Sequence, residues 1–182
     1  MKIIIVYRKS GTLRYLGHLD FQHLWERLLR ISQLPLAYSE GFHPTMKMNL
    51  IQPLSVGMEG YHEYLHLTLK EPRDRKTVLA TLASIVPHGL SLLKVAETRW
   101  TAKQFHHRKS SLILDCSFEG SQVVPEGLVS PPIKAIAVLS PNKWRVELEN
   151  TSQEQTNFSR LLLTRAPTID ILKLTRVRLN YR

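Results

Sequence analysis

The order of apolar periodicities in the first 97 residues places the strongest constraint on what this chain can fold into. Residues 2–7 form a short β-branched run typical of a strand, and apolar side chains then recur at helical spacing between His18 and Ser32. The same two periodicities continue in strands at 46–52, 61–69 and 90–96 and in a helix at 74–86. The resulting order, β-α-β-β-α-β, predicts an α+β, ferredoxin-like fold for residues 1–97.

Residues 111–182 repeat this order in a weaker form. Strands are predicted at 111–118, 133–139, 143–149 and 169–179, and a helix at 156–165. The first helix of the pattern is missing, because residues 120–132 are too rich in glycine and proline to form one. We therefore interpret this part as a second, degraded ferredoxin-like half, packed with the first as one unit. A basic, histidine-containing connector at 98–110 joins the two halves.

The charge of the chain narrows the class of partner. It has 25 Lys and Arg against 15 Asp and Glu, a formal net charge of +10, and 43% apolar residues, which is enough for a core. Basic domains of this kind attract polyanions, with nucleic acid as the first candidate and acidic lipid or an acidic protein face behind it. The composition therefore predicts a globular protein that binds a polyanion.

The single cysteine, Cys116, limits the redox chemistry. One thiol cannot form an internal disulfide, and this usage is typical of a reducing, cytoplasmic setting. An iron–sulfur cluster is normally held by several thiolates, so we expect this chain to bind no such cofactor itself. The N-terminal apolar run has only four residues, and no segment approaches the roughly 20 apolar residues of a membrane span. Neither a signal peptide nor membrane association is predicted.

The strand at 61–69 has two different faces. Glu63 and three leucines alternate with a polar and aromatic set, which is His62, Tyr64, His66 and Thr68. His62 and His66 lie roughly 13 Å apart along a strand, which is too far to share a metal ion, so no metal site is predicted. Such a face can stack RNA bases or can pack against the second half. We favour burial, because half-repeats usually bury one face between them.

A helix and the loop after it present the most specific pattern of polar residues. One polar stripe follows the helix, and the loop holds larger side chains than a turn requires. The predicted binding patch comprises His18, Asp20, Arg27, Arg30, Ser39, Gly41, Phe42, His43 and Pro44. In this patch Arg27 and Arg30 would contact phosphate or a carboxylate, and Phe42 would stack or act as an apolar anchor. The alternatives are a helix cap at Asp20 and an ordinary turn in the loop.

The C-terminal strand is a second basic feature. Strand alternation places Arg176, Arg178 and Arg182 on one side. This predicts an edge that contacts the nucleic-acid backbone. The alternative is an edge strand whose charges only keep it from pairing with another chain.

Signatures of catalysis are absent from the sequence. It contains no P-loop, no G-x-G-x-x-G and no zinc-ligand spacing. The absence of these signatures favours a non-catalytic protein. If the chain does cleave RNA, His18 or His43 is the candidate general base.

Two stretches of the sequence match the patterns of a known family. The pattern K-x-G-x-x-R-Y-x-S-H-L-D is matched by Lys9, Gly11, Arg14, Tyr15, His18, Leu19 and Asp20. The pattern R-A-x-R-R-x-x-L-P-x-x-Y-S-x-G-F-x-P is matched by Arg27, Arg30, Leu34, Pro35, Tyr38, Ser39, Gly41, Phe42 and Pro44. Further matches are Pro53-Leu54-Ser55-Val56-Gly57, Glu63-Tyr64 and Val86-Pro87-His88-Gly89. On these residues the sequence resembles the radical-SAM-linked DUF2344 domain family. It departs from the family pattern at Gly17, Thr45-Met46 and His66.

The resemblance implies a partner enzyme. Members are similar to domains fused to, or encoded beside, radical-SAM proteins, in some cases near genes for ribonucleases and ribosomal proteins; such a partner would carry SAM and an iron–sulfur cluster. The resemblance thus implies an accessory domain that binds RNA or a ribonucleoprotein and works with a separate radical-SAM enzyme. Two alternatives stay open: a metal-independent RNA endonuclease of the tandem ferredoxin-like type, and a pure protein-interaction module.

Overall fold

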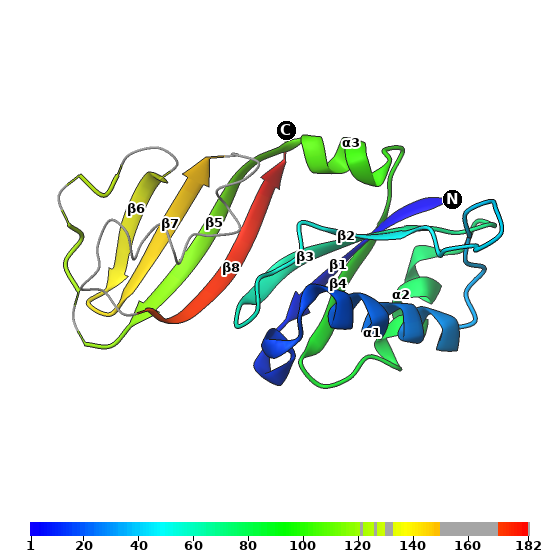
Figure 1. The fold of residues 1–182 in the computed structure, drawn as a ribbon, viewed down its shortest axis with the longest axis horizontal. Helices are drawn as coiled ribbons and strands as arrows, with labels where there is room; N and C mark the ends of the chain where they lie inside the picture. Colours follow the sequence, from blue (N-terminus) through cyan, green and yellow to red (C-terminus); the bar gives the residue numbers. More distant parts are fainter. Residues whose placement is uncertain (121, 126, 130–132, 150–170, 182) are drawn as a thin grey trace.

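The computed structural model describes residues 1–120, 122–125, 127–129, 133–149 and 171–181. Its elements are β1 (Lys2–Lys9), the 3-10 helix η1 (Gly11–Tyr15), α1 (His18–Ile31), β2 (Met48–Ile51), β3 (Glu59–Thr68), α2 (Arg75–Ala83), β4 (Leu90–Glu97), α3 (Ala102–His107), β5 (Lys109–Phe118), β6 (Ile133–Ser140), β7 (Lys143–Glu149) and β8 (Ile171–Tyr181). The strands form one mostly antiparallel sheet in the order β4-β1-β3-β8-β5-β7-β6, with β2 also paired to β3 (Figure 1). The fold is therefore mixed α/β. None of the helices in these residues is long and apolar enough to cross a bilayer.

The elements predicted for residues 1–97 are present, with ends that differ by a few residues. In α1 the apolar stripe that includes Phe21 and Trp25 is buried, as its helical spacing predicts. Trp25 packs edge-on against Tyr7 of β1, with ring centroids 5.2 Å apart. The strands predicted in the second half are found as β5, β6, β7 and β8, whereas the helix predicted at 156–165 lies outside the described residues.

The connector predicted at 98–110 contains the short helix α3. Thr101 and Gln104 form a capping box at its start. The N–H of Gln104 donates to Thr101 Oγ1 at 3.2 Å, and the N–H of Thr101 donates to Gln104 Oε1 at 2.9 Å. Phe105, the next residue, is buried against the sheet. The connector therefore contains a helix at residues 102–107 that was not predicted, because the capping box and this apolar anchor start a helix there.

The first half of the sheet has one covered and one largely open face. Figure 1 shows α1 and α2 on one side of the strands β1, β3 and β4, and α3 on the other. The helix-covered face is apolar, with the side chains of Ile5 and Leu65 wholly buried. The open face, as we call the opposite one, carries Lys2, Ile4, Val6 and Arg8 in β1 and His62, Tyr64 and His66 in β3.

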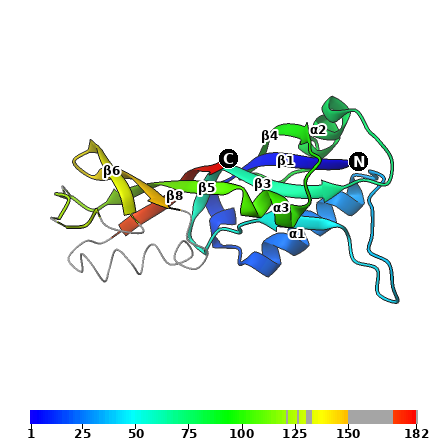
Figure 2. The ribbon, with the colours of Figure 1, turned by 90° about the horizontal axis from the view of Figure 1, so that it is seen from above.

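β8 joins the second half to the first along the edge of β3. It pairs in parallel with β3 at Glu59 and Gly60, and β2 pairs with residues 64–67 of the same strand. The sheet therefore forks along β3 and runs on through β8 and β5 (Figures 1 and 2). The second half extends the sheet, and the expected burial of the 62–68 face against it is found only in part. Tyr64 packs against the apolar cluster of the second half, whereas His62 stays exposed.

We call the pairing of β3 with β8, which joins the two halves, the seam. A bulge in β3 shapes it. β1 pairs Tyr7 with Glu63 and then Lys9 with Gly60, so Glu63 and Gly60 share the helix-covered face. The Glu63 side chain folds over Gly60, where a Cβ would lie 2.3 Å from the carboxylate. Arg176 of β8 lies opposite Gly60 and donates from Nε to Glu63 Oε1 at 2.8 Å. Both charged side chains are buried, so an ion pair inside the core ties the halves together.

Candidate nucleic-acid interface

A groove lies on the open face between the strands and α3. Its volume is about 540 Å³. Three aromatic residues line it, namely Tyr64, Trp100 and Phe105, with His62 and Lys94 beside them. The ring centroids of Tyr64 and Phe105 are 5.7 Å apart, and those of Trp100 and Phe105 are 6.1 Å apart. We call the space between these five residues the aromatic groove; its size is within the range of small-ligand sites.

His66 holds Trp100 in the wall of the groove. Its ring Nε2 lies 3.0 Å from the carbonyl oxygen of Trp100, and because a carbonyl only accepts, Nε2 carries the proton. Nδ1 is buried and has no hydrogen-bond partner among the described residues. Burial lowers the pKa of His66; the Trp100 carbonyl opposes this effect and the charge of Lys2 adds to it. His66 is therefore a neutral ring of fixed tautomer at neutral pH.

Basic side chains surround the aromatic groove. Those on this face, on α3 or on the segments that flank α3 are Lys2, Arg8, Lys94, Arg99, Lys103 and Arg108. Glu97 is the acidic residue in the groove lining. The guanidinium of Arg8 stacks 4.6 Å from the Tyr61 centroid, and that of Arg108 stacks 4.3 Å from Trp100. Aromatic rings among cations are the arrangement with which proteins bind single-stranded nucleic acid.

The predicted patch on α1 is exposed, but its members do not converge. His18 and Asp20 lie at the start of the helix, and Arg27 and Arg30 lie towards its end. A helix of 14 residues is about 20 Å long, so its two ends cannot share one small ligand. Arg30 also pairs with Glu26 at 3.8 Å, one turn earlier.

The loop part of the patch is the tip of a hairpin formed by residues 37–47. The Ser39 hydroxyl accepts a hydrogen bond from the N–H of Thr45 at 2.9 Å, so Ser39 closes the hairpin. Phe42 is completely exposed at the tip, and Figure 2 shows the hairpin projecting from the body. The neighbouring residues of the predicted patch, Gly41, His43 and Pro44, are exposed as well.

Arg176 of the predicted basic edge is not exposed. β8 is an interior strand, because β3 and β5 pair with it on opposite sides. Arg176 is 3% exposed and its guanidinium is bonded to Glu63, so the predicted phosphate contact does not fit its position. The Arg178 side chain and all of Arg182 lie outside the described residues.

The candidate general bases lack the geometry of a catalytic pair. His18 and His43 lie on different elements, and within the described chain neither side chain has a hydrogen-bond partner to orient it. In the same residues, no three His, Cys, Asp or Glu side chains are placed to hold a metal ion. Cys116 is buried, and its burial, together with the charge of Asp115, raises the pKa of the thiol to about 12. This thiol stays protonated at neutral pH.

Both halves of the protein fall within one sequence family. The family is DUF2344, described as an uncharacterized protein conserved in bacteria, and it matches residues 2–176. The chain belongs to this family. A comparison with curated proteins finds no match. Because the match extends into β8, the DUF2344 domain includes the seam between the halves.

The DUF2344 pattern that begins at Lys9 contributes to the seam. The buried Lys9 ammonium donates to the carbonyl of Leu16 at 3.1 Å and lies 4.4 Å from the ring centroid of Phe21. Burial lowers the pKa of Lys9; the charge of Glu63 raises it and that of Arg176 lowers it. Lys9 thereby fixes the turn from β1 into α1 beside the Glu63–Arg176 pair.

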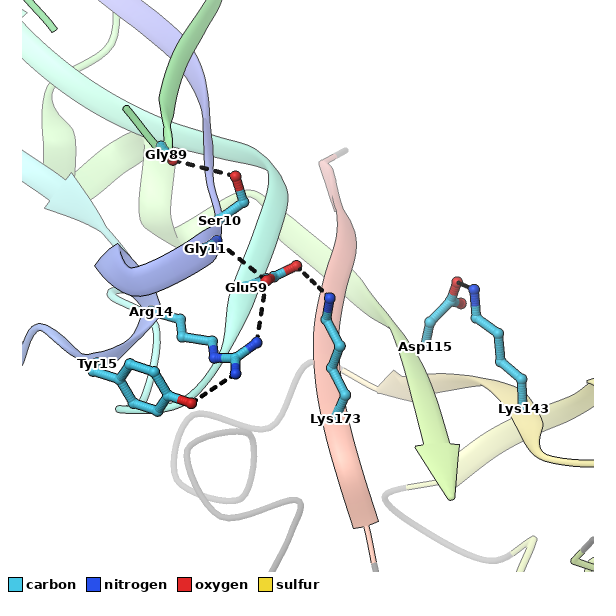
Figure 3. Close-up of polar contacts among 9 residues, drawn as sticks. All are labelled: Ser10, Gly11, Arg14, Tyr15, Glu59, Gly89, Asp115, Lys143 and Lys173. Carbon is cyan, nitrogen blue, oxygen red and sulfur yellow. Dashed lines mark hydrogen bonds and ion pairs between the residues drawn. The ribbon is translucent and has the colours of Figure 1, made fainter. Parts of the chain in front are cut away.

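Glu59 contacts the next residues of the same DUF2344 pattern (Figure 3). Its carboxylate accepts a hydrogen bond from the N–H of Gly11 at 3.2 Å and lies 3.5 Å from Arg14 and 2.8 Å from Lys173 of β8. Burial alone would raise the pKa of Glu59, but the hydrogen bonds from Lys173 and Gly11 and the charges of Lys173 and Arg14 bring it below its ordinary value. Glu59 is thus an ionised link between η1 and the second half.

Proposed function

We propose that this DUF2344 chain is a non-catalytic accessory domain that binds RNA or a ribonucleoprotein and works with a separate radical-SAM enzyme. The observation that carries the RNA part is the aromatic groove, where three rings lie among basic side chains on a largely uncovered sheet face. A positive surface alone would suit an acidic protein equally well. The partly exposed rings of Tyr64 and Trp100 favour RNA, because each base offers a face on which they can stack.

Stacking and phosphate contacts together supply enough affinity for this role. A base on an aromatic ring contributes about 1–3 kcal/mol. Two stacked bases would thus provide about 2–6 kcal/mol of the roughly 8 kcal/mol that a micromolar complex requires. The remainder would come from the cations around the groove, and that part should weaken steeply as salt is added.

The positions of the three tryptophans allow a direct test. Trp25 and Trp144 are wholly buried, whereas Trp100 lines the groove. Titration with an oligouridylate of about twelve nucleotides should therefore quench the fluorescence of Trp100. Trp100→Phe should keep a stacking ring and remove the signal, with binding still measurable by the anisotropy of labelled RNA. Trp100→Ala should weaken binding by about 5- to 150-fold.

Several outcomes would contradict RNA binding in the aromatic groove. Equal affinity of Trp100→Ala and the wild type would show that RNA binds elsewhere, and equal affinity at low and moderate salt would exclude the phosphate contacts. Arg73→Gln is the control, because this half-exposed cation pairs with Glu71 away from the groove. Cleavage of RNA in chelator, lost in His18→Ala or His43→Ala, would favour the endonuclease alternative.

The radical-SAM part of the proposal rests on the family resemblance and on a surface that the groove leaves free. The tip of the 37–47 hairpin lies at the end of the first half away from the seam (Figure 1), with Phe42 fully exposed. An exposed aromatic residue of this kind is a suitable anchor for a partner protein. Tagged protein should retain a radical-SAM protein with and without nuclease, and Phe42→Ala should lose it. Retention that depends wholly on RNA would remove the docking role.

We also propose that the first half is a ferredoxin-like unit. This is supported by the element order β1-α1-β2-β3-α2-β4 and the strand order β4-β1-β3-β2. Proteins built on such a sheet can use the face away from the helices to stack bases, which is where the aromatic groove lies.

A further inference from the structure

We propose that the sheet of the second half continues the RNA-binding surface through a basic strip, Lys143, Arg145 and Lys173, which binds the phosphodiester backbone of a single strand. This inference rests on the proposed function and adds the path of the RNA beyond the aromatic groove. It also gives the second half a role in binding.

The pairing of the strands places the basic strip on the open face. Residues paired across neighbouring strands point to the same side of a sheet. Asp115 pairs with Arg145 of β7 and with Thr175 of β8, and Thr175 pairs with Glu59 of β3. Glu59 points away from the helix-covered face, because its neighbour Gly60 points towards it. The strip and the groove therefore share one side of a sheet that is continuous across the seam.

Two lysines of the strip flank a small residue. Ser117 of β5 pairs with Lys143 on one side and with Lys173 on the other. Neighbouring strands are about 4.8 Å apart, so the two lysines start about 10 Å apart with only a serine between them. Arg145 follows Lys143 at the next position on the same face. This row crosses three strands and offers cations to a backbone that runs across the sheet.

Two buried carboxylates hold the cations in place (Figure 3). Asp115 accepts two hydrogen bonds from Arg145, at 2.7 and 3.0 Å, and lies 3.2 Å from Lys143. Glu59 lies 2.8 Å from Lys173. The carboxylate side chains are 5% exposed, whereas those of Lys143, Arg145 and Lys173 are 40%, 43% and 41% exposed. The acidic partners are therefore hidden and the positive groups face solvent.

The strip has more positive charge than its carboxylates neutralise. Arg14 also contacts Glu59. Four cations, Arg14 and the three of the strip, therefore pair with only two carboxylates, Glu59 and Asp115. An ammonium has three donors and a guanidinium has five, so each cation has donors beyond those that its carboxylate accepts. A network that served only to neutralise Glu59 and Asp115 would need no such surplus. Phosphate oxygens are the ligand class that matches it.

The groove also reaches β8, the strand that carries Lys173 of the strip. His62 lines the groove, and its Nδ1 lies 3.2 Å from the carbonyl oxygen of Val177 in β8. From β3 to β7 there are three strand spacings, about 15 Å. A strand of RNA with one base in the groove therefore needs only a few more nucleotides to reach Lys143.

The test compares short and long RNA on one pair of double variants. Oligouridylates of about four and about twelve nucleotides represent the groove alone and the groove with the strip. Lys143→Gln/Lys173→Gln removes two cations and leaves Arg145 on Asp115 and Arg14 on Glu59. Lys70→Gln/Arg73→Gln is the matched control, because it removes the same charge from the loop after β3. Anisotropy titrations at several salt concentrations give the affinity and its salt dependence, and a thermal melt confirms folding.

Each lost phosphate contact should weaken binding about fivefold at roughly 0.1 M salt. The strip variant loses two contacts and should therefore bind the long RNA about 25-fold more weakly. The slope of log K against log salt should fall by about 1.4. The short RNA and the control variant should keep wild-type behaviour. Equal losses in both double variants, or a long RNA that binds no tighter than the short one, would overturn the inference while the groove stands. A wild-type protein that binds neither RNA would remove the proposed function as well, leaving an acidic protein face as the ligand of this surface.

Discussion

Replacement of Arg176 with methionine should destabilise the protein by about 3–5 kcal/mol, because it leaves the Glu63 carboxylate buried without its partner. The two side chains are 4% and 1% exposed, and the guanidinium also bonds to the carbonyl of Gln52. Water cannot replace these hydrogen bonds without opening the seam. The Lys9 ammonium shares this face, but it is already bonded to the carbonyl of Leu16.

A loss of this size is measurable and large for a protein of this length. Total stabilities are about 5–15 kcal/mol, and 1 kcal/mol shifts Tm by about 2–4 °C in a chain of this size. Arg176→Met should therefore lower Tm by about 6–20 °C. Urea unfolding followed by tryptophan fluorescence gives the free energy directly, because Trp25 and Trp144 are buried in separate clusters, one in each half.

Two further variants separate a broken ion pair from a general disturbance. Glu63→Leu/Arg176→Met removes both charges and should recover much of the loss, since replacing a buried pair by apolar groups is often neutral or better. Lys134→Met removes one partner of an exposed pair with Glu147 and should cost less than about 1 kcal/mol. The reasoning fails if Arg176→Met costs no more than Lys134→Met, or if the double variant is as unstable as Arg176→Met.

Three more predictions concern the seam and the groove. Gly60→Ala should cost about 1–3 kcal/mol in urea unfolding, because its Cβ would overlap the Glu63 carboxylate; a loss below about 0.5 kcal/mol would show that the pair can move aside. Because the pKa of His66 is lowered on folding, the unfolded chain takes up its proton first as pH falls below about 6.5. Stability should then decrease from about pH 7 to 5, by at most about 1.4 kcal/mol per pH unit, and a His66→Phe variant should show a flatter curve. Thr101→Ala should destabilise α3 by about 1 kcal/mol, seen as faster hydrogen exchange at Phe105, and unchanged exchange there would contradict the capping role.

Local patterns in the sequence predict the first half well because each of its elements has one buried face. The spacing of Phe21 and Trp25 identifies α1, and the alternation of Glu63 with three leucines identifies β3 and its covered face. α3 could have been found as well, since Thr101 and Gln104 form a readable capping box. It was missed because the basic residues around it are equally typical of a solvated connector.

The features that could not be predicted depend on which strands become neighbours. Arg176 fits an exposed edge strand as long as the partners of β8 are unknown. Its burial follows from the pairing of β8 with both β3 and β5, which no local pattern indicates. The bulge that turns Glu59 and Glu63 to opposite faces is likewise visible only in the register with β1. The groove needs Trp100 to be folded back onto β3, and the contact that does this is made by His66.

Most residues that carry the family resemblance have a different role from those that form the groove, and Tyr64 belongs to both sets. Lys9, Gly11 and Arg14 hold the turn into α1 and, through Glu59, the second half. Trp100 and Phe105 lie outside the matched patterns. If the seam keeps the two halves in one sheet, it also keeps the groove and the basic strip on one face at a fixed spacing. The seam would then set the length of RNA that both can hold, and loosening it should weaken binding of long RNA while short RNA still binds the groove.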